Sequence, residues 1–347
     1  MAAADRITLG EGNTPLLRST RVGPALSLHQ LYFKLENCNP SGSYKDRFSA
    51  AEMARVLRVG ALSCVATSSG NTGSSLAAYC ARYRIQCTII VGQAVPEGKL
   101  AQMRAHGAQL LRVTGFDTSP EVGRRVTAIL TKFSTTRNVP LIISSYRHCP
   151  EGMRGVESIP EELDRQLEGG IDHVFVPVGS GGLFTAVCLG FARGQARLPK
   201  VHAVQPEKCS TIVGAWQRGD DEIREVESGT AITGISVSYN IDGDAALRLL
   251  RKSGGLGLAV SDCAIFEAQR RMLEEEGIYA EPAGAAALAG LIQAVRERRI
   301  GPADKIVCVV SGAGFKDPDS ISHVAARRPV LWVTPDDLER QLAETGA

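Results

Sequence analysis

Short apolar runs rich in β-branched residues recur along the chain, and they alternate with longer segments in which apolar residues return at helical spacing. The runs typical of buried parallel strands are 31–35, 87–92, 109–113, 140–144, 173–178, 201–204 and 305–310. The segments with helical spacing are 74–84, 99–106, 121–132, 161–167, 262–276 and 283–298. This alternation predicts an α/β fold with open, mostly parallel, twisted sheets and helices on both faces. The glycine-rich stretch 254–258 predicts a loop.

The length and composition indicate a globular chain with about two domains. It has 347 residues, of which 44% are hydrophobic. The formal net charge of +2 gives no basic field that would attract nucleic acid or anionic lipid. No stretch approaches the ~18–20 uninterrupted apolar residues that cross a bilayer, and the polar start resembles no export signal. We therefore expect a cytoplasmic protein with no nucleic-acid or membrane partner.

The cysteines and histidines show no spacing typical of a metal site. The nine cysteines are scattered without a Cys-x-x-Cys pair, and the six histidines include no His-x-x-x-His pair. Most of the cysteines are expected to be reduced thiols in the core of a cytosolic protein. No metal is expected.

Four polar or glycine-rich turns follow predicted strands. They are the turn before Lys45 and the turns at 68–73, 179–182 and 311–314. In open α/β sheets, ligands bind where loops leave the carboxyl ends of the strands. These turns are therefore the places where chemistry is expected.

Lys45 is predicted to lie in the first turn of a helix that continues through 48–57. The positive end of the helix dipole disfavours an ammonium group there and helps to release a neutral amine able to form an imine. Taken alone, the residue is also compatible with an ordinary solvated lysine, which is the commoner situation for this side chain.

The turns at 68–73 and 179–182 each connect a strand to the start of a helix. The first presents N–H groups and hydroxyls suited to a substrate carboxylate, although serine, threonine and asparagine are also common helix caps. The glycines of the second would let backbone amides approach one phosphate group. Phe184 stands where a dinucleotide fingerprint needs its third glycine, which disfavours a nicotinamide cofactor.

Ser311 follows the last predicted strand. A hydroxyl can hydrogen-bond a pyridine nitrogen without protonating it. A ring cofactor with such a partner is a weaker electron sink than one whose ring nitrogen is paired with a carboxylate. A serine in a tight turn with no ligand is the alternative.

Taken together and in this order, the motifs resemble the fold type II family of pyridoxal-phosphate enzymes, and within it the threonine synthases. The matching segments are 11–16, 34–47, 68–79, 95–99, 281–286 and 312–317, so the resemblance covers nearly the whole chain. It implies a two-domain, tryptophan synthase β-like fold. A large cofactor-binding domain would comprise residues 1–46 and 146–325, a small mobile domain residues 47–145, and a C-terminal tail residues 326–347. The resemblance also implies a homodimer.

The resemblance assigns a role to each turn. Lys45 would be the catalytic residue, bound covalently to pyridoxal 5'-phosphate, and Asn71 would hydrogen-bond the phenolic oxygen of the cofactor ring. The cofactor phosphate would be bound by Gly179, Ser180, Gly181, Gly182 and Leu183. Ser311 would face the pyridine nitrogen. The substrate carboxylate would be bound by Ser68, Ser69, Gly70 and Thr72.

Segment 143–152 departs from the threonine synthases. Those enzymes carry a pattern close to Asn-Ser-x-Asn-Pro-Tyr-Arg before Glu-Gly, whereas here Cys149 stands at the arginine position and Ile143 at the first asparagine. Arg147 or His148 is the candidate to bind a substrate phosphate instead, because a guanidinium can contact a phosphate through two hydrogen bonds. The 179–183 turn and Ser311 look more like the dehydratases and cysteine synthases.

Three hypotheses about activity follow. The first is a lyase or synthase that eliminates or replaces a group on a small, possibly O-phosphorylated amino-acid substrate, as threonine synthases and the cysteine or cysteate synthases do. The second is a serine or threonine dehydratase that yields ammonia and a 2-keto acid. The third is a binding or regulatory protein without turnover, against which the intact Lys45 and Asn71 argue.

Overall fold

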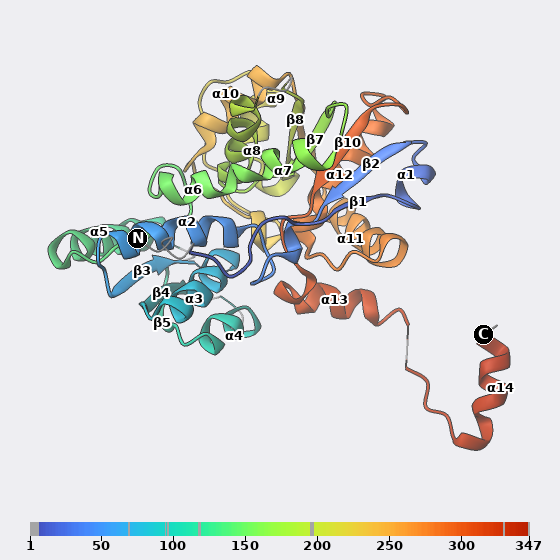
Figure 1. Cartoon of the computed structure of the whole chain (residues 1–347), viewed down its shortest axis with the longest axis horizontal. Coiled ribbons are helices and arrows are strands. Elements are labelled where there is room, and N and C mark those ends of the chain that lie inside the picture. Colours follow the sequence, from blue (N-terminus) through green and yellow to red (C-terminus); the bar gives the residue numbers. More distant parts are fainter. Residues whose placement is uncertain are drawn as a thin grey trace, which may run out of the picture.

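The computed structural model describes residues 7–68, 70–93, 95, 97–116, 119–194, 198–328 and 330–345. Its strands form two separate sheets, one with the order β1-β2-β10-β7-β8-β9 and one with the order β5-β4-β3-β6 (Figure 1). Every pairing is parallel except the antiparallel pair of β1 with β2. The predicted α/β fold with mostly parallel sheets is therefore confirmed.

The elements have the following bounds. The strands are β1 (Leu16–Arg18), β2 (Gln30–Lys34), β3 (Ser63–Thr67), β4 (Gln86–Gly92), β5 (Gln109–Val113), β6 (Leu141–Ile142), β7 (His173–Pro177), β8 (Lys200–Pro206), β9 (Gly257–Val260) and β10 (Lys305–Val309). The helices are α1 (Val22–Ala25), α2 (Lys45–Arg58), α3 (Asn71–Tyr83), α4 (Glu97–Ala105), α5 (Pro120–Arg137), α6 (Pro150–Val156), α7 (Ser158–Gln166), α8 (Gly182–Arg193), α9 (Ile212–Arg218), α10 (Gly243–Ser253), α11 (Asp262–Glu276), α12 (Pro282–Arg296), α13 (Pro318–Ala325) and α14 (Pro335–Thr345). A short 3-10 helix, Glu36–Cys38, follows β2.

The six-stranded sheet is covered by helices on both faces. Val174 and Val176 of β7 belong to the apolar cluster that contains residues of α8, whereas Phe175 between them belongs to the cluster that contains residues of α12. Successive side chains of a strand point to opposite faces, so both faces of this sheet are buried. That explains why its central strands are continuous apolar runs in the sequence.

The four-stranded sheet lies within residues 63–142 and is also covered on two sides. Ile89 of β4 packs in the cluster shared with α3, and the next residue, Ile90, packs against Val126 and Leu130 of α5. This sheet falls inside the segment expected to form a small domain, whereas the strands of the other sheet come from residues 16–34 and 173–309. The boundaries at 46/47, 145/146 and 325/326 stay predictions.

The glycine-rich stretch 254–258 was wrongly predicted to be a loop throughout. Gly257 begins β9, which pairs in parallel with β8. A Cβ on Gly255 would lie 1.8 Å from the Val201 carbonyl oxygen, and one on Gly257 would lie 2.9 Å from Cε3 of Trp216. These glycines therefore allow close packing of an edge strand. The run predicted at 140–144 forms only the two-residue strand β6.

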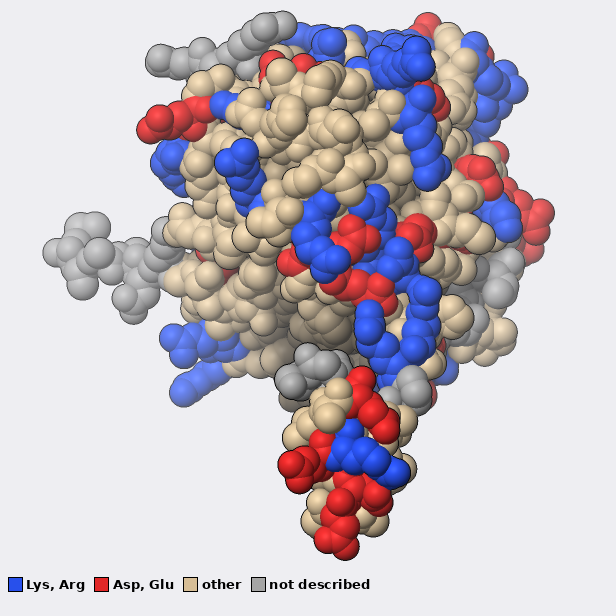
Figure 2. All heavy atoms as spheres, turned by 90° about the vertical axis from the view of Figure 1, so that its right-hand side faces the viewer, with Lys and Arg blue, Asp and Glu red and all other residues tan. Residues whose placement is uncertain are grey.

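The C-terminal helix α14 lies apart from both sheets (Figure 1). The face of the molecule that carries it shows acidic and basic side chains interspersed, in keeping with the near-neutral net charge (Figure 2). Among the described helices, none is both long enough and apolar enough to cross a membrane.

A network of buried charges connects β2, the 3-10 helix after it, α2 and α7. Lys34 Nζ lies 2.6 Å from Glu162 Oε2. The Arg47 guanidinium lies 2.6 Å from Glu162 Oε1 and 2.7 Å from Glu36 Oε2. All four side chains are buried. Arg47 is two residues after Lys45, so this network fixes the start of α2 against the six-stranded sheet.

We predict that Glu162→Gln lowers the free energy of unfolding by about 3–5 kcal/mol, because removing one partner of a buried ion pair leaves the other charges uncompensated. Urea unfolding at neutral pH measures this. Glu161→Gln, a change at the exposed neighbour on the same helix, is the control and should have little effect.

The same carboxylate should make the protein acid-sensitive. Burial alone would raise the pKa of Glu162, but the hydrogen bonds from Arg47 and Lys34 overcome it and lower the pKa from 4.5 to about 2. Its stabilising contribution is complete above pH 4.5 and is lost as the pH falls towards 2. The free energies of unfolding of the wild type and Glu162→Gln should therefore converge as the pH falls through this range. A difference in free energy that stays constant with pH would contradict the lowered pKa of Glu162.

Candidate active site

The turn before Lys45 and the turn after β10 are joined directly. Ser43 and Gly312 form an antiparallel bridge, and the Tyr44 N–H donates to the Ser311 carbonyl oxygen at 3.1 Å. Lys45 then begins α2, as the sequence predicted. The Lys45 amine is partly buried, donates to the Ser144 hydroxyl at 2.8 Å and lies 4.7 Å from the ring centroid of Tyr44. It is therefore held in place, unlike a freely solvated lysine.

The glycine turn after β7 leads into an uncapped helix start. Gly181 is the N-cap of α8, has φ +97° and brings no capping side chain. A Cβ at Gly181 would lie 3.0 Å from the Asp242 carbonyl oxygen, and one at Gly182 would lie 3.1 Å from Asp242 Oδ2. The first N–H groups of a helix have no partner within the helix and bind anions well. The Thr185 hydroxyl, in the first turn of α8, is buried without a described partner. This turn is suited to a phosphate group.

Asp242 connects that glycine turn to the segment next to Lys45. Its N–H donates to the Ser180 carbonyl oxygen at 3.1 Å, while its carboxylate accepts from the backbone N–H groups of Tyr146 and Arg147 at 2.9 and 3.1 Å. Burial raises the pKa of Asp242, although the two N–H donors and the charge of Lys45 act in the opposite direction. Sequence patterns contain no signal for Asp242, because its carboxylate is bound by backbone groups about 95 residues away.

The Ser68 hydroxyl, two residues before the N-cap Gly70, accepts from the N–H groups of Gly70 and Gly73 at 3.3 and 2.9 Å. It therefore satisfies N–H groups at the start of α3, which is close to the helix-cap alternative for this turn. Gly70 and Thr72 are partly buried at the start of α3. Ser69 lies outside the described residues. The role of this turn in binding a substrate carboxylate stays a prediction.

Asn71 is held by a buried carboxylate. Its amide nitrogen donates to Glu281 Oε1 at 2.7 Å, and a Cβ at Gly312 would lie only 2.0 Å from that same oxygen. Burial raises the pKa of Glu281, although the Asn71 hydrogen bond and the charge of Lys316 partly offset it. Burial lowers the pKa of Lys316 in turn. The start of α3 is thereby fixed to the turn after β10.

Ser311 is buried at the end of β10. Within the described part of the chain, its hydroxyl has no hydrogen-bond partner. Pyridoxal 5'-phosphate needs an amine for its aldehyde, and Lys45 has one. It needs N–H donors for its phosphate, which the uncapped start of α8 has, and a partner for its ring nitrogen, which the free Ser311 hydroxyl can be. The residues present therefore fit the cofactor. The individual roles of Asn71, of residues 179–183 and of Ser311 stay predictions.

The 144–149 segment lies beside Lys45 and offers two cationic candidates. Arg147 is exposed and only its backbone is bound, to Asp242. His148 contacts the Ser145 hydroxyl through Nδ1 at 2.8 Å, and burial and then Arg147 lower its pKa. Cys149, at the arginine position of the threonine synthases, is buried and so cannot bind a substrate there.

The comparisons with known proteins agree with this geometry. A family model described as pyridoxal-phosphate dependent enzyme matches residues 7–312. The threonine synthase of Methanocaldococcus jannaschii is 33% identical over 333 residues, covering 93% of this chain and 80% of that protein. The threonine synthase of Methanosarcina acetivorans is 32% identical, covering 97% and 83%.

Solved structures share the fold at lower identity. The processed form of threonine deaminase isoform 2 from Solanum lycopersicum has a TM-score of 0.76 at 22% identity, covering 91% of this chain and 88% of that one. Maize serine racemase has a TM-score of 0.73 at 20% identity, covering 96% and 92%. The predicted cofactor is thereby confirmed at the level of the family. The chain belongs to the pyridoxal-phosphate-dependent enzymes of fold type II.

Proposed function

We propose that the enzyme eliminates or replaces a side-chain group of a small, O-phosphorylated amino-acid substrate, in the manner of the threonine synthases. The observation that carries this proposal is the position of the Lys45 amine. It donates to Ser144, and Ser144 belongs to the same short segment as the exposed Arg147. This contact supports the proposal that the Lys45 amine is the base for the α-proton and Arg147 the cation for a leaving phosphate.

When bound, pyridoxal phosphate supplies a conjugated ring that accepts the negative charge left after proton removal. The chain supplies the proton transfer. The Lys45 amine would take the α-proton and hold it as an ammonium group. The Ser144 hydroxyl accepts a hydrogen bond from this nitrogen at 2.8 Å and so restricts its position.

The leaving group distinguishes the alternatives. A phosphate leaves as a stable anion and needs a cation rather than a proton donor, which is the role proposed for Arg147. A hydroxyl group leaves only when an acid protonates it. The likeness in fold to threonine deaminase supports the second candidate, a serine or threonine dehydratase. Ser311 is compatible with both, because a hydroxyl leaves the ring nitrogen unprotonated.

We predict that the cofactor-loaded enzyme releases inorganic phosphate from homoserine phosphate or phosphoserine. The purified enzyme is titrated with amino acids and their phosphates while its visible absorbance is followed, and products are then assayed for phosphate, ammonia and keto acid. Ammonia and keto acid from unphosphorylated serine or threonine, without phosphate release from either ester, would establish the dehydratase instead. An absorbance that no amino acid shifts would indicate a protein without turnover.

Lys45→Ala should lower kcat by about 10²–10⁴-fold or more, because a positioned general base contributes that much. The fold should be kept, since the buried charges of α2 are untouched. Lys132→Ala, at an exposed lysine of α5, is the matched control. Steady-state turnover and unfolding curves are compared for both variants. An equal loss of turnover in the two variants, or full activity in Lys45→Ala, would contradict the proposal that Lys45 is the general base.

Arg147→Gln should raise KM for the phosphorylated substrate by about 10- to 100-fold, since a hydrogen bond to a charged group contributes about 1.5–3 kcal/mol. It should change cofactor binding little. Arg154→Gln, at an exposed arginine of α6, is the control. If both variants keep the wild-type KM, the phosphate is bound elsewhere and the role proposed for Arg147 is wrong.

A further inference from the structure

Three cysteines that are far apart in the sequence meet beside the four-stranded sheet. Their Sγ atoms all lie within 4.8 Å of one another, and those of Cys64 and Cys80 are 3.5 Å apart. The third is Cys87. All three side chains are buried, with 1%, 1% and 5% of their surfaces exposed. This cluster could not be predicted from the sequence, because no two of its members have the spacing of a metal motif.

The fold brings the three sulfurs together through ordinary strand and helix packing. Cys64 of β3 and Cys87 of β4 are direct partners in a parallel pairing, so their side chains leave the same face of the sheet. Cys80 comes from the last turns of α3, which packs on that face. The cluster therefore joins two neighbouring strands and a helix.

The sulfur spacing suits a metal ion better than a disulfide. A disulfide holds its sulfur atoms about 2.05 Å apart. A zinc ion binds each thiolate at about 2.3 Å, so sulfurs around one ion are roughly 3.8–4.0 Å apart. The Cys64–Cys80 separation of 3.5 Å lies just below this value, and the other sulfur separations do not exceed 4.8 Å. Binding thus requires the sulfurs to move relative to one another by about 1 Å or less.

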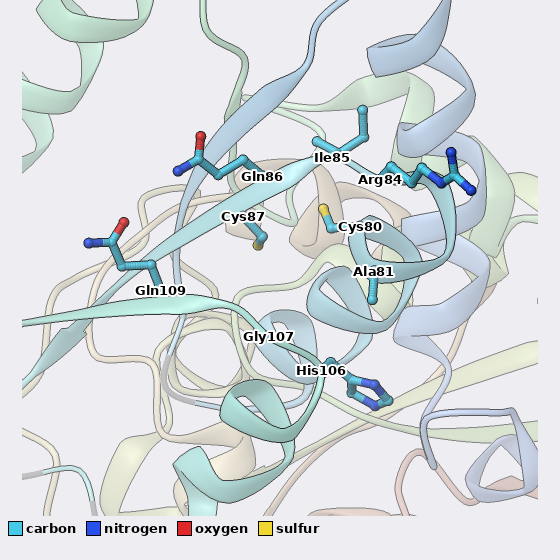
Figure 3. A pocket seen from close by; sticks show the side chains of 9 residues that line it. All are labelled: Cys80, Ala81, Arg84, Ile85, Gln86, Cys87, His106, Gly107 and Gln109. Atoms are coloured by element: carbon cyan, nitrogen blue, oxygen red, sulfur yellow. The ribbon is translucent and has the colours of Figure 1, made fainter.

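A pocket of about 370 Å³ lies next to the cluster. Cys80 and Cys87 line it together with residues that include Arg84, Gln86 and His106 (Figure 3). The imidazole of His106 is turned away from the two sulfur atoms in this view. The pocket therefore borders two of the three cysteines, on the side of the cluster where a water molecule could be the fourth ligand, as at three-ligand zinc sites.

We propose that Cys64, Cys80 and Cys87 bind one thiophilic metal ion, of the Zn²⁺ or Cu(I) class, at a site separate from the pyridoxal-phosphate centre. Three metal–sulfur bonds replace three S–H bonds, and three protons leave to solvent. With Zn²⁺ the site carries a net charge of −1. The soft sulfur ligands exclude Mg²⁺ and Ca²⁺, which prefer oxygen. The bound ion crosslinks β3, β4 and α3 and so stabilises the small sheet.

The test uses the reduced, cofactor-loaded enzyme after removal of metal with a chelator. Cd²⁺ is added as the probe, and the ultraviolet thiolate-to-cadmium charge-transfer band is followed. We expect the band to saturate at one Cd²⁺ per chain. Zn²⁺, or Cu(I) in a separate anaerobic experiment, should displace the band. The ion that displaces it should also raise the midpoint temperature of thermal unfolding.

Cys64→Ala, Cys80→Ala and Cys87→Ala should each weaken cadmium binding by more than about 100-fold, since losing a ligand costs more than losing an outer-shell partner. Cys188→Ala is the matched control, because Cys188 is a free cysteine of equal burial outside the cluster. It should bind as the wild type does. No saturable band in the wild type, or equal loss in Cys188→Ala, would overturn the proposal.

A second measurement needs no variant and so does not depend on the folding of the substituted proteins. X-ray absorption of the zinc-loaded wild type should show three sulfur neighbours at about 2.3 Å. A shell of nitrogen and oxygen alone would mean that the ion binds elsewhere, and the three cysteines would then be core thiols only.

Discussion

The structure depends on the pairing of four buried charges at the start of α2. Lys34, Glu36, Arg47 and Glu162 come from a strand, a 3-10 helix and two α-helices, and each reaches an opposite charge without access to solvent. Separating one of these charges from its partner would leave a buried ion unpaired, which is costly, so the pairing favours one relative position of the four elements. That position sets where Lys45, two residues before Arg47, begins its helix.

Segments distant in the sequence complete the site around this fixed point. The turn after β10 pairs with the residues before Lys45, Ser144 receives the amine, and Asp242 joins the 146–147 backbone to the glycine turn. Each link is a hydrogen bond between loops or helix starts that are far apart in the sequence. The sheets place those turns close together, and the hydrogen bonds fix their orientation.

Much of this could be predicted from the sequence, because hydrophobic periodicity and glycine-rich turns are local signals. Most strands of both sheets and the helix start at Lys45 follow from them, whereas β1 and β9 do not. What they could not predict depends on contacts between distant segments. Gly255 and Gly257 suggest a loop, because their sequence does not show that Val201 and Trp216 pack closely against them. Asp242 is bound through backbone groups, which leave no trace in residue type. The three-cysteine cluster forms because the pairing of β3 with β4 places Cys64 beside Cys87, and the packing of α3 adds Cys80.

This arrangement requires that Lys45 is the lysine that carries the cofactor. Reduction of the cofactor-loaded enzyme with borohydride, followed by peptide mapping, identifies that lysine. The reduced cofactor is expected on the peptide that contains Lys45. Lys316 is the informative competitor, because burial lowers its pKa and it lies near Asn71 through Glu281. Label on Lys316, or on any lysine other than Lys45, would contradict the account.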